Sequence, residues 1–145
     1  MDLRECKNKG IIRKIKIDKN LVSSLMQMSD MKEKTIEQVE LNEITINAFL
    51  PIAYDSLREI LEAYCILHGF KVGNHDCLGK LSKQLEPDFD LNSFDRFRYA
   101  RNGINYYGTK MDLTQGKILI KGILKLKSEM VKKTKKILSQ NDTIN

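Results

Sequence analysis

Residues 45–68 show the strongest helical periodicity in the chain, and this feature limits the fold more than any other. At about 100° per residue, large apolar side chains fall on one arc and charged side chains on the opposite arc. The apolar arc contains Leu50, Tyr54, Leu57, Leu61, Tyr64, Cys65 and Leu67. The charged arc contains Asp55, Arg58, Glu59 and Glu62. The pattern predicts a long amphipathic helix, ended by Gly69, that must bury its apolar side against other elements.

Four further segments have helical patterns. Apolar residues recur at helical spacing over about 18–41, 75–85, 92–107 and from Asp112 or Thr114 to about Ser139. Asp18 is a suitable N-cap, and Gly108 is suited to end a helix. No segment shows period-two alternation or hairpin turn residues, so we expect no sheet. Helices joined by short loops favour antiparallel neighbours, and the sequence therefore predicts an all-α, up-and-down antiparallel bundle of four to five helices.

Length and composition are typical of one globular domain. The chain has 145 residues, of which 41% are hydrophobic and 30% are charged, which is enough for a single core without added cross-links. We expect one domain over residues 1–145, with its core at about 18–139. Residues 1–17 would form an arm or a short helix, and residues 140–145 a disordered tail.

The cysteines and the apolar segments indicate the compartment. Cys6, Cys65 and Cys77 are an odd number without a CxxC pair, and the first residues lack the pattern of a signal peptide. No apolar run reaches the roughly 20 residues that cross a bilayer. We therefore expect a cytoplasmic protein with reduced cysteines and no membrane association.

Residues 98–108 place charged side chains where a helix would bury apolar ones. One sector of about 120° on this helix contains Phe94, Phe97, Arg98, Arg101, Ile104 and Asn105. An arginine among phenylalanines is costly unless a carboxylate, a phosphate or a second subunit satisfies it. The spacing is equally compatible with a structural arginine bonded to loop carbonyls and with an arginine that binds a ligand.

The order of several segments resembles the HEPN superfamily over about residues 45–130. The resemblance rests on a helix with Ala53-Tyr-Asp-Ser-Leu-Arg-Glu-Ile-Leu-Glu-Ala-Tyr, a loop ending His-Gly-Phe-Lys-Val-Gly-Asn-His-Asp, a short leucine helix, and Ala100-Arg-Asn-Gly-Ile-Asn-Tyr-Tyr-Gly. Members of this superfamily are helical bundles that usually dimerise. Many are RNases whose motif is an arginine, four to six residues, and a histidine. The resemblance implies a helical bundle, a homodimer and a function related to RNA.

Arg101 and Asn102 match the start of that motif, but tyrosines stand where its histidine would. Tyr106 follows Arg101 after four residues and Tyr107 after five. Tyrosine, with a pKa of about 10, is a poor general base at pH 7, but it can donate a hydrogen bond, stack on a base or pack in a dimer interface. Non-catalytic members with a tyrosine in this region are thought to bind nucleotide, RNA or a partner protein. By the same resemblance, His75 is interpreted as a structural residue at the start of its helix.

The last predicted helix carries a basic stripe. Its members are Lys117, Lys121, Lys125, Lys132, Lys135 and Lys136. With 25 basic and 19 acidic residues, the chain has a net charge of +6, and the excess is concentrated in its last quarter. Lysines at successive turns can follow a polyanion. A solvated lysine face near a helix C-terminus is the more common explanation of such a stripe, and both interpretations stay open.

A metal site is a weaker hypothesis. Cys65 and His68 lie three residues apart at a helix end, and His75 and Cys77 follow across the loop, which is compatible with zinc. However, His-x-Cys is an uncommon zinc pair, and buried free cysteines are frequent in helical cores. We therefore expect no metal ion and no cofactor.

These patterns together predict an RNA- or nucleotide-binding protein without efficient catalysis. Two alternatives remain: a metal-independent endoribonuclease that uses Arg101, and an interaction module that docks a nucleotidyltransferase or another partner. The candidate catalytic residues are Arg101, Asn102 and Tyr106. The candidate residues for nucleic acid or nucleotide are Arg98, Arg101, Asn105, Tyr107, Lys117, Lys121 and Lys125. In the expected homodimer, the motif helices would face each other around a shared groove.

Overall fold

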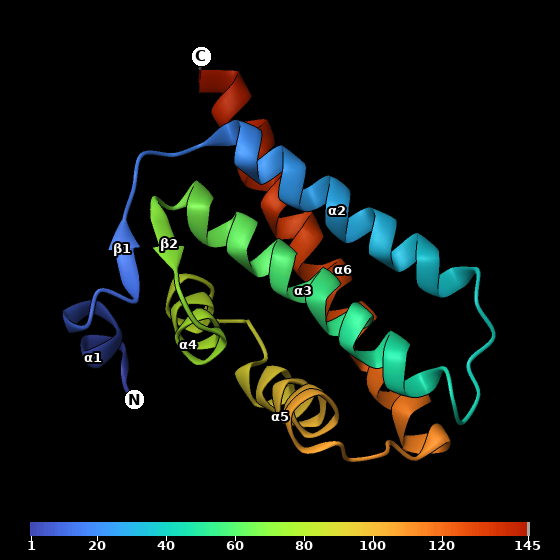
Figure 1. The fold of residues 1–145 in the computed structure, drawn as a ribbon. Helices are drawn as coiled ribbons and strands as arrows, with labels where there is room; N and C mark the ends of the chain where they lie inside the picture. Colours follow the sequence, from blue (N-terminus) through green and yellow to red (C-terminus); the bar gives the residue numbers. More distant parts are fainter. Residues whose placement is uncertain (145) are drawn as a thin grey trace.

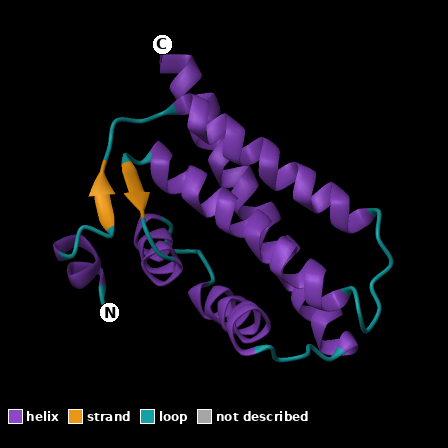
Figure 2. Cartoon of the chain, in the orientation of Figure 1, coloured by secondary structure: helices purple, strands orange, loops and turns teal. Residues whose placement is uncertain are grey.

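A computed structural model of the protein describes residues 1–144, with side chains described up to residue 140. The described part is an all-α helical bundle, as predicted, with six helices and one small sheet (Figures 1 and 2). The elements are α1 (Leu3–Asn8), β1 (Ile12–Lys14), α2 (Lys19–Glu37), α3 (Ile46–Leu67), β2 (Phe70–Val72), α4 (His75–Leu85), α5 (Leu91–Tyr107) and α6 (Leu113–Ile144).

Helix α3 is the centre of the bundle and packs against α2, α4, α5 and α6. Because neighbours surround it, 14 of its 22 residues are buried. The burial extends to Glu59, which the sequence placed on the charged, solvent-facing arc. Glu59 is only 3% exposed and accepts a hydrogen bond from Lys32 of α2. This part of the predicted polar face is therefore a buried contact, because α2 covers it.

The three long helices do not all alternate in direction. Figure 1 shows α2 running antiparallel to α3, as short-loop packing predicts. Helix α6 runs parallel to α3. Ile46, at the start of α3, lies against Gly116 near the start of α6. At the other end, Ile66 and Leu67 of α3 share an apolar cluster with residues near the C-terminal half of α6. The chain returns to the starting end through α4 and α5, and this return makes the parallel arrangement possible.

Local capping accounts for most helix ends. Asp18 caps α2 through Oδ1, which accepts a hydrogen bond from the Leu21 amide at 3.0 Å, as predicted. Gly108 ends α5 in a left-handed conformation with φ of 64°. Asp112 accepts from the Gln115 amide at the start of α6. Helix α6 continues to Ile144, although the sequence predicted a disordered tail over 140–145; residue 145 lies outside the described residues.

The first 17 residues form both a helix and a strand. Helix α1 is followed by β1, which pairs antiparallel with β2 in the register Ile12↔Val72. The expectation of no sheet was therefore wrong. A ladder of three residues per strand is too short for the alternation that identifies a strand in a sequence.

The structure corrects the expectation that all cysteines are reduced. Cys6 of α1 and Cys77 of α4 form a disulfide across 71 residues of sequence. Cys65 is free and buried. Among the described residues, no helix is long and apolar enough to cross a membrane.

Candidate functional site

Helix α5 carries the candidate arginines at the edge of the core. Asp90 caps the helix by accepting from the Ser93 amide at 3.0 Å. Phe94 and Phe97 are buried and anchor the helix on the bundle. Arg98 and Arg101 follow them at spacings of four residues, so they lie on the same side at the border between core and solvent.

Arg98 is held by two carboxylates at long distances. Its side chain is 16% exposed, and one terminal nitrogen lies 3.4 Å from Asp95 and 3.7 Å from Asp76 of α4. Its guanidinium also lies 5.0 Å from the centre of the exposed Tyr99 ring. The buried Nε atom of Arg98 has no hydrogen-bond partner. The pairing of Arg98 is therefore incomplete.

Arg101 has no carboxylate within 4.0 Å among the described residues. One terminal nitrogen donates to Tyr106 Oη at 2.9 Å and to Asn102 Oδ1 at 3.3 Å. The guanidinium lies 5.7 Å from the Tyr54 ring and 5.3 Å from the Tyr106 ring. Its Nε is buried without a partner. Only neutral oxygens and aromatic faces thus compensate this charge, and the loop carbonyls expected for a structural arginine do not contact it.

His75 joins the arginines from the first turn of α4. Asn74 caps that turn by accepting from the Cys77 amide at 2.8 Å. Helix α4 approaches α5 closely at Gly79, where an added Cβ would lie 2.7 Å from the Phe94 ring. This approach brings the start of α4 beside the arginines of α5. The imidazole Nδ1 lies 3.1 Å from Tyr54 Oη of α3.

Burial and neighbouring charges keep this histidine neutral. Desolvation and the positive charges of Arg58 and Arg101 lower the pKa of His75 to about 4. Burial raises the pKa of the Tyr54 phenol above its usual range, so the phenol keeps its proton. With both groups neutral, either the Tyr54 hydroxyl donates to Nδ1 and the imidazole proton lies on Nε2, or Nδ1–H donates to Tyr54 Oη and Nε2 carries a lone pair.

Sequence reasoning missed Tyr54, Arg58 and His75 as members of this cluster. It interpreted His75 as structural, Tyr54 as core and Arg58 as part of a solvated arc. The one available signal was the Tyr54 phenol, because a buried tyrosine usually needs a hydrogen-bond partner. That signal does not identify the partner.

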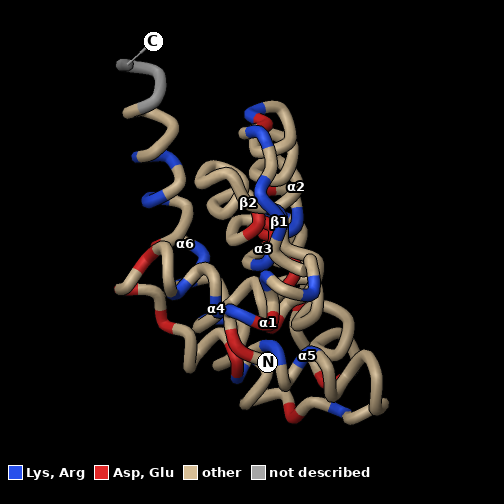
Figure 3. The backbone as a smooth tube through the Cα atoms, turned by 90° about the vertical axis from the view of Figure 1, so that its left-hand side faces the viewer, with Lys and Arg blue, Asp and Glu red and all other residues tan. Residues whose placement is uncertain are grey.

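Apart from Asn102, the remaining predicted residues lie away from this cluster. Asn102 contacts Arg101, whereas Asn105 and Tyr107 are exposed and Tyr107 is 81% accessible. The basic stripe of α6, visible as blue segments in Figure 3, includes the exposed lysines at 117, 121 and 125. Lys125 borders a groove of about 250 Å³ together with Arg96 of α5. Arg96 is about 200° around the helix from Arg98, so the stripe and the arginine pair lie on different sides of α5.

The four residues considered for zinc have other partners. Cys77 is bonded to Cys6, and His75 contacts Tyr54. His68 Nδ1 lies 2.9 Å from the Tyr64 carbonyl. Cys65 contacts a buried serine hydroxyl, and burial raises the pKa of its thiol to about 12. Within the described residues, no three histidine, cysteine or acidic side chains are arranged to hold a metal ion.

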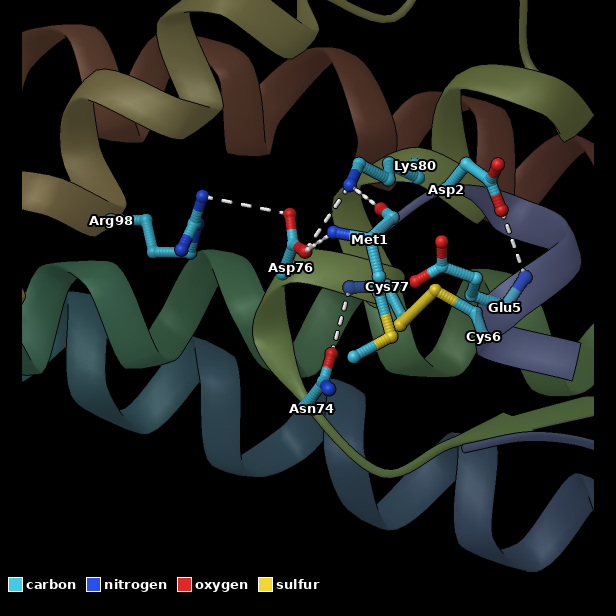
Figure 4. Close-up of a disulfide and its surroundings, with 9 residues drawn as sticks. All are labelled: Met1, Asp2, Glu5, Cys6, Asn74, Asp76, Cys77, Lys80 and Arg98. Carbon is cyan, nitrogen blue, oxygen red and sulfur yellow. Dashed lines mark hydrogen bonds and ion pairs between the residues drawn. A yellow bond between two sulfur atoms is a disulfide. The ribbon is translucent and has the colours of Figure 1, made fainter. Parts of the chain in front are cut away.

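Figure 4 shows that Asp76 connects the site to the N-terminal end of the chain. One carboxylate oxygen faces Arg98, and the other lies 3.2 Å from Lys80 Nζ. Cys77, the next residue, carries the disulfide to α1.

Comparison of the chain with protein-family models, with curated proteins and with solved structures gives no match. The chemistry of the site is therefore inferred from its own geometry: two incompletely paired arginines beside a neutral histidine.

Proposed function

We propose that the protein binds RNA or a nucleotide through a phosphate group held by Arg98 and Arg101. The observation that carries the proposal is Arg101, a partly buried guanidinium with no carboxylate partner and an unsatisfied Nε. A phosphate oxygen would satisfy these donors, because guanidinium presents its N–H groups in a fork that matches phosphate.

The neutral state of His75 supports the same ligand. In the tautomer in which Nδ1 accepts from Tyr54, the Nε2–H group is free of that bond and can donate to a phosphate oxygen. Arg58 of α3 adds positive charge near the imidazole, and it is itself paired with Glu62 at 2.9 Å and with Asp55 at 3.6 Å. An anion would therefore enter a region with a positive potential and a neutral donor.

Two exposed tyrosines favour a polynucleotide over a mononucleotide. Tyr99 lies beside Arg98 and Tyr106 beside Arg101, and their side chains are 68% and 66% exposed. They are seven residues apart and share one side of α5, about 10 Å apart along the axis. Each arginine thus has an accessible aromatic face next to it, which suits phosphate contact with adjacent base stacking. RNA is the substrate class that the HEPN resemblance implies, and a homodimer would place two such helices around one groove.

The test compares two arginines on the same helix. Arg101→Ala should weaken binding of a fluorescein-labelled 12-mer oligoribonucleotide at least about tenfold by anisotropy, because it removes the unpaired guanidinium. Arg96→Ala is the matched control: Arg96 is exposed and donates only to Ser93 Oγ among the described side chains. It should change the affinity less than about twofold.

Thermal unfolding of both variants completes the test. Both should unfold near the wild-type temperature, because Arg101 forms no ion pair in the described chain. A large loss of stability in Arg101→Ala would instead make this arginine structural. Equal loss of binding in both variants would reject the site. Competition with a mononucleotide distinguishes the two ligand classes. At a concentration equal to that of the site, the mononucleotide should displace the labelled oligoribonucleotide only if the site binds nucleotides.

Metal-independent cleavage of RNA is a second candidate, favoured by the position of His75. In the tautomer with its proton on Nδ1, where Nδ1–H donates to Tyr54 Oη, the Nε2 lone pair can take the proton of a ribose hydroxyl while the arginines stabilise the charge on phosphate. The 2′ oxygen would attack phosphorus and form a cyclic phosphate, and the bond from phosphorus to the 5′ oxygen of the next nucleotide would break. The leaving 5′ oxygen takes a proton from water, and the imidazolium returns its proton to the solvent. Incubation with RNA in chelator should then yield cyclic phosphate ends in the wild type only. No product above the level of Arg101→Ala would eliminate this candidate.

A further inference from the structure

A disulfide ties the N-terminal arm, residues 1–14, to the helix that carries His75 and Asp76. We propose that the Cys6–Cys77 bond is a redox-controlled tether that sets the anion affinity of the Arg98–Arg101 site. This inference rests on the proposed function. It assigns a regulator to that site.

The bond is the main restraint on the arm. Helix α1 has six residues, which is too short to be stable alone, and it packs against α4 and β1. Strand β1 adds a ladder of only three residues. Cys6 and Cys77 are both fully buried. Without the bond, the arm would depend on these small contacts, on the burial of Ile12, and on two polar contacts of Met1: its carbonyl accepts from Lys80, and its ammonium lies 3.6 Å from Asp76.

The tether acts next to the proposed site. Cys77 follows His75 by two residues and Asp76 by one, in the first turn of α4. Lys80, which holds the arm at the Met1 carbonyl, also lies 3.2 Å from Asp76 Oδ2. Only Asp76 Oδ1 faces Arg98, and it does so at 3.7 Å (Figure 4). The arm itself reaches this carboxylate through the Met1 ammonium, which lies 3.6 Å from Asp76 Oδ2. The closed arm thus keeps Asp76 engaged, and Arg98 retains capacity for a ligand.

Reduction would reverse that arrangement. A dithiol donates two electrons and two protons: the Cys6–Cys77 bond breaks, two cysteine thiols form, and the dithiol becomes a cyclic disulfide. Because both sulfurs are buried, the arm must open locally for the reductant to enter. Once the arm is released, Asp76 loses the Met1 ammonium and can pair fully with Arg98. The first turn of α4, which positions His75, also loses its cross-link. Both effects lower the affinity for an anion.

The experiment uses the full chain with Cys65→Ala, so that the tether is the only thiol pair. The oxidised and dithiothreitol-reduced forms are verified by alkylation and mass, and each is titrated with the labelled 12-mer oligoribonucleotide. We expect the oxidised form to bind about fivefold or more tightly than the reduced form. Cys6→Ser with Cys77→Ser should bind like the reduced form and ignore the reductant. Asp76→Asn should restore affinity to the reduced form, because it removes the carboxylate that competes for Arg98.

Each outcome is decisive. Equal affinity of the two forms would overturn the tether and leave the proposed function intact. Absence of binding in both forms would instead reject the proposed function, and the tether with it. Unfolding of the bundle on reduction, measured by circular dichroism, would also overturn the proposal, because the bond would then maintain the fold and not the site. An affinity of Asp76→Asn that stays low after reduction would exclude the carboxylate as the mediator.

Discussion

Two regions of this molecule bury or partly bury cationic side chains, and they differ in the partners of these cations. Between α2, α3 and α6, Lys32 pairs with the buried Glu59, and Lys127 lies 2.8 Å from Glu33. Between α3, α4 and α5, Arg101 has aromatic and neutral neighbours but no carboxylate in the described chain. A paired buried cation can be explained by folding alone. A cation without a partner costs stability, so its presence suggests a ligand that supplies the missing charge.

Lys127 illustrates the first kind. It is 4% exposed, and its ammonium donates to the Ser29 carbonyl at 3.0 Å as well as to Glu33. These bonds join α6 to α2. Such a group completes its own hydrogen bonding, whereas the two arginines of α5 each retain a buried Nε without a partner. The two regions therefore differ in the partners of their cations and not in burial alone, since each contains side chains that are at least partly buried.

The largest predicted effect breaks a pair in the first region. Lys32→Met should lower the free energy of unfolding by about 3 kcal/mol, because it leaves the Glu59 carboxylate buried without a cation. Chemical denaturation at pH 7 measures the change. Lys34→Met is the matched control, since the Lys34–Asp30 pair on the same helix is largely exposed, and it should have almost no effect. Adding Glu59→Met to Lys32→Met should recover most of the loss. A loss below about 1 kcal/mol would mean that the pair is not needed for folding, and the contrast between the regions would disappear.

The second prediction concerns the pH dependence of the other region. The pKa of His75 is lowered to about 4 from 6.5, so between these values the unfolded chain binds a proton that the folded protein does not. Stability due to His75 is complete above pH 6.5 and is lost as the pH falls to 4. The groups that face the imidazole are Arg58 and Asp55 of α3 and Arg98 and Arg101 of α5.

Denaturation at several pH values measures this loss. From about pH 7 to pH 4, the wild type should lose about 2 kcal/mol more stability than His75→Gln, which cannot gain the proton. The figure is below the full value of the shift because the side chain is partly exposed. A wild type and a variant with the same pH profile would show that the cluster tolerates a further positive charge. The arginines would then be better compensated than their contacts indicate.

The smallest predicted effect concerns the exposed lysines of α6. Lys121→Gln and Lys125→Gln should leave stability unchanged, because both side chains are exposed. If the oligoribonucleotide follows the stripe, each change should lower the salt dependence of binding by about 0.7 in the slope of log K against log salt. Titrations at several salt concentrations give this slope. We expect no such decrease, because the stripe lies on a different side of α5 from the arginine pair. A decrease would extend the interface to Lys125 and to Arg96, which borders the same groove.

Much of the fold could be predicted because its determinants are local. The 75–85 helix matches α4, and the caps at Asp18 and Gly108 were identified from residue type and position. The solvent-facing assignment of Glu59 failed because the periodicity of a central helix does not show that a second helix covers its polar arc. The expectation of no sheet failed for a similar reason, since β1 and β2 are stabilised by pairing with each other and neither has a strand pattern of its own.

The residues of the candidate site also divide into those that the sequence identified and those that only the structure brings together. The arginines and tyrosines of α5 were identified because they share one helix, where residue number determines direction. His75 was interpreted as a structural residue at the start of its helix, and its contact with Tyr54 and its closeness to Arg101 could not be predicted, since these residues stand 21 and 26 residues away on other helices. The basic stripe was identified correctly as exposed, yet only the packing of α6 against α5 shows that it lies on the side of Arg96.

The amino-acid sequence by itself determined the helices of this protein, their caps and the unusual charge of α5, because helix periodicity and capping act over three or four residues. Only the tertiary structure decided that His75, Tyr54 and Arg101 meet and that Cys6 bonds Cys77 across 71 residues. Such contacts are set by how whole helices pack to bury their apolar faces, and the close approach of α4 to α5 at Gly79 is one of them.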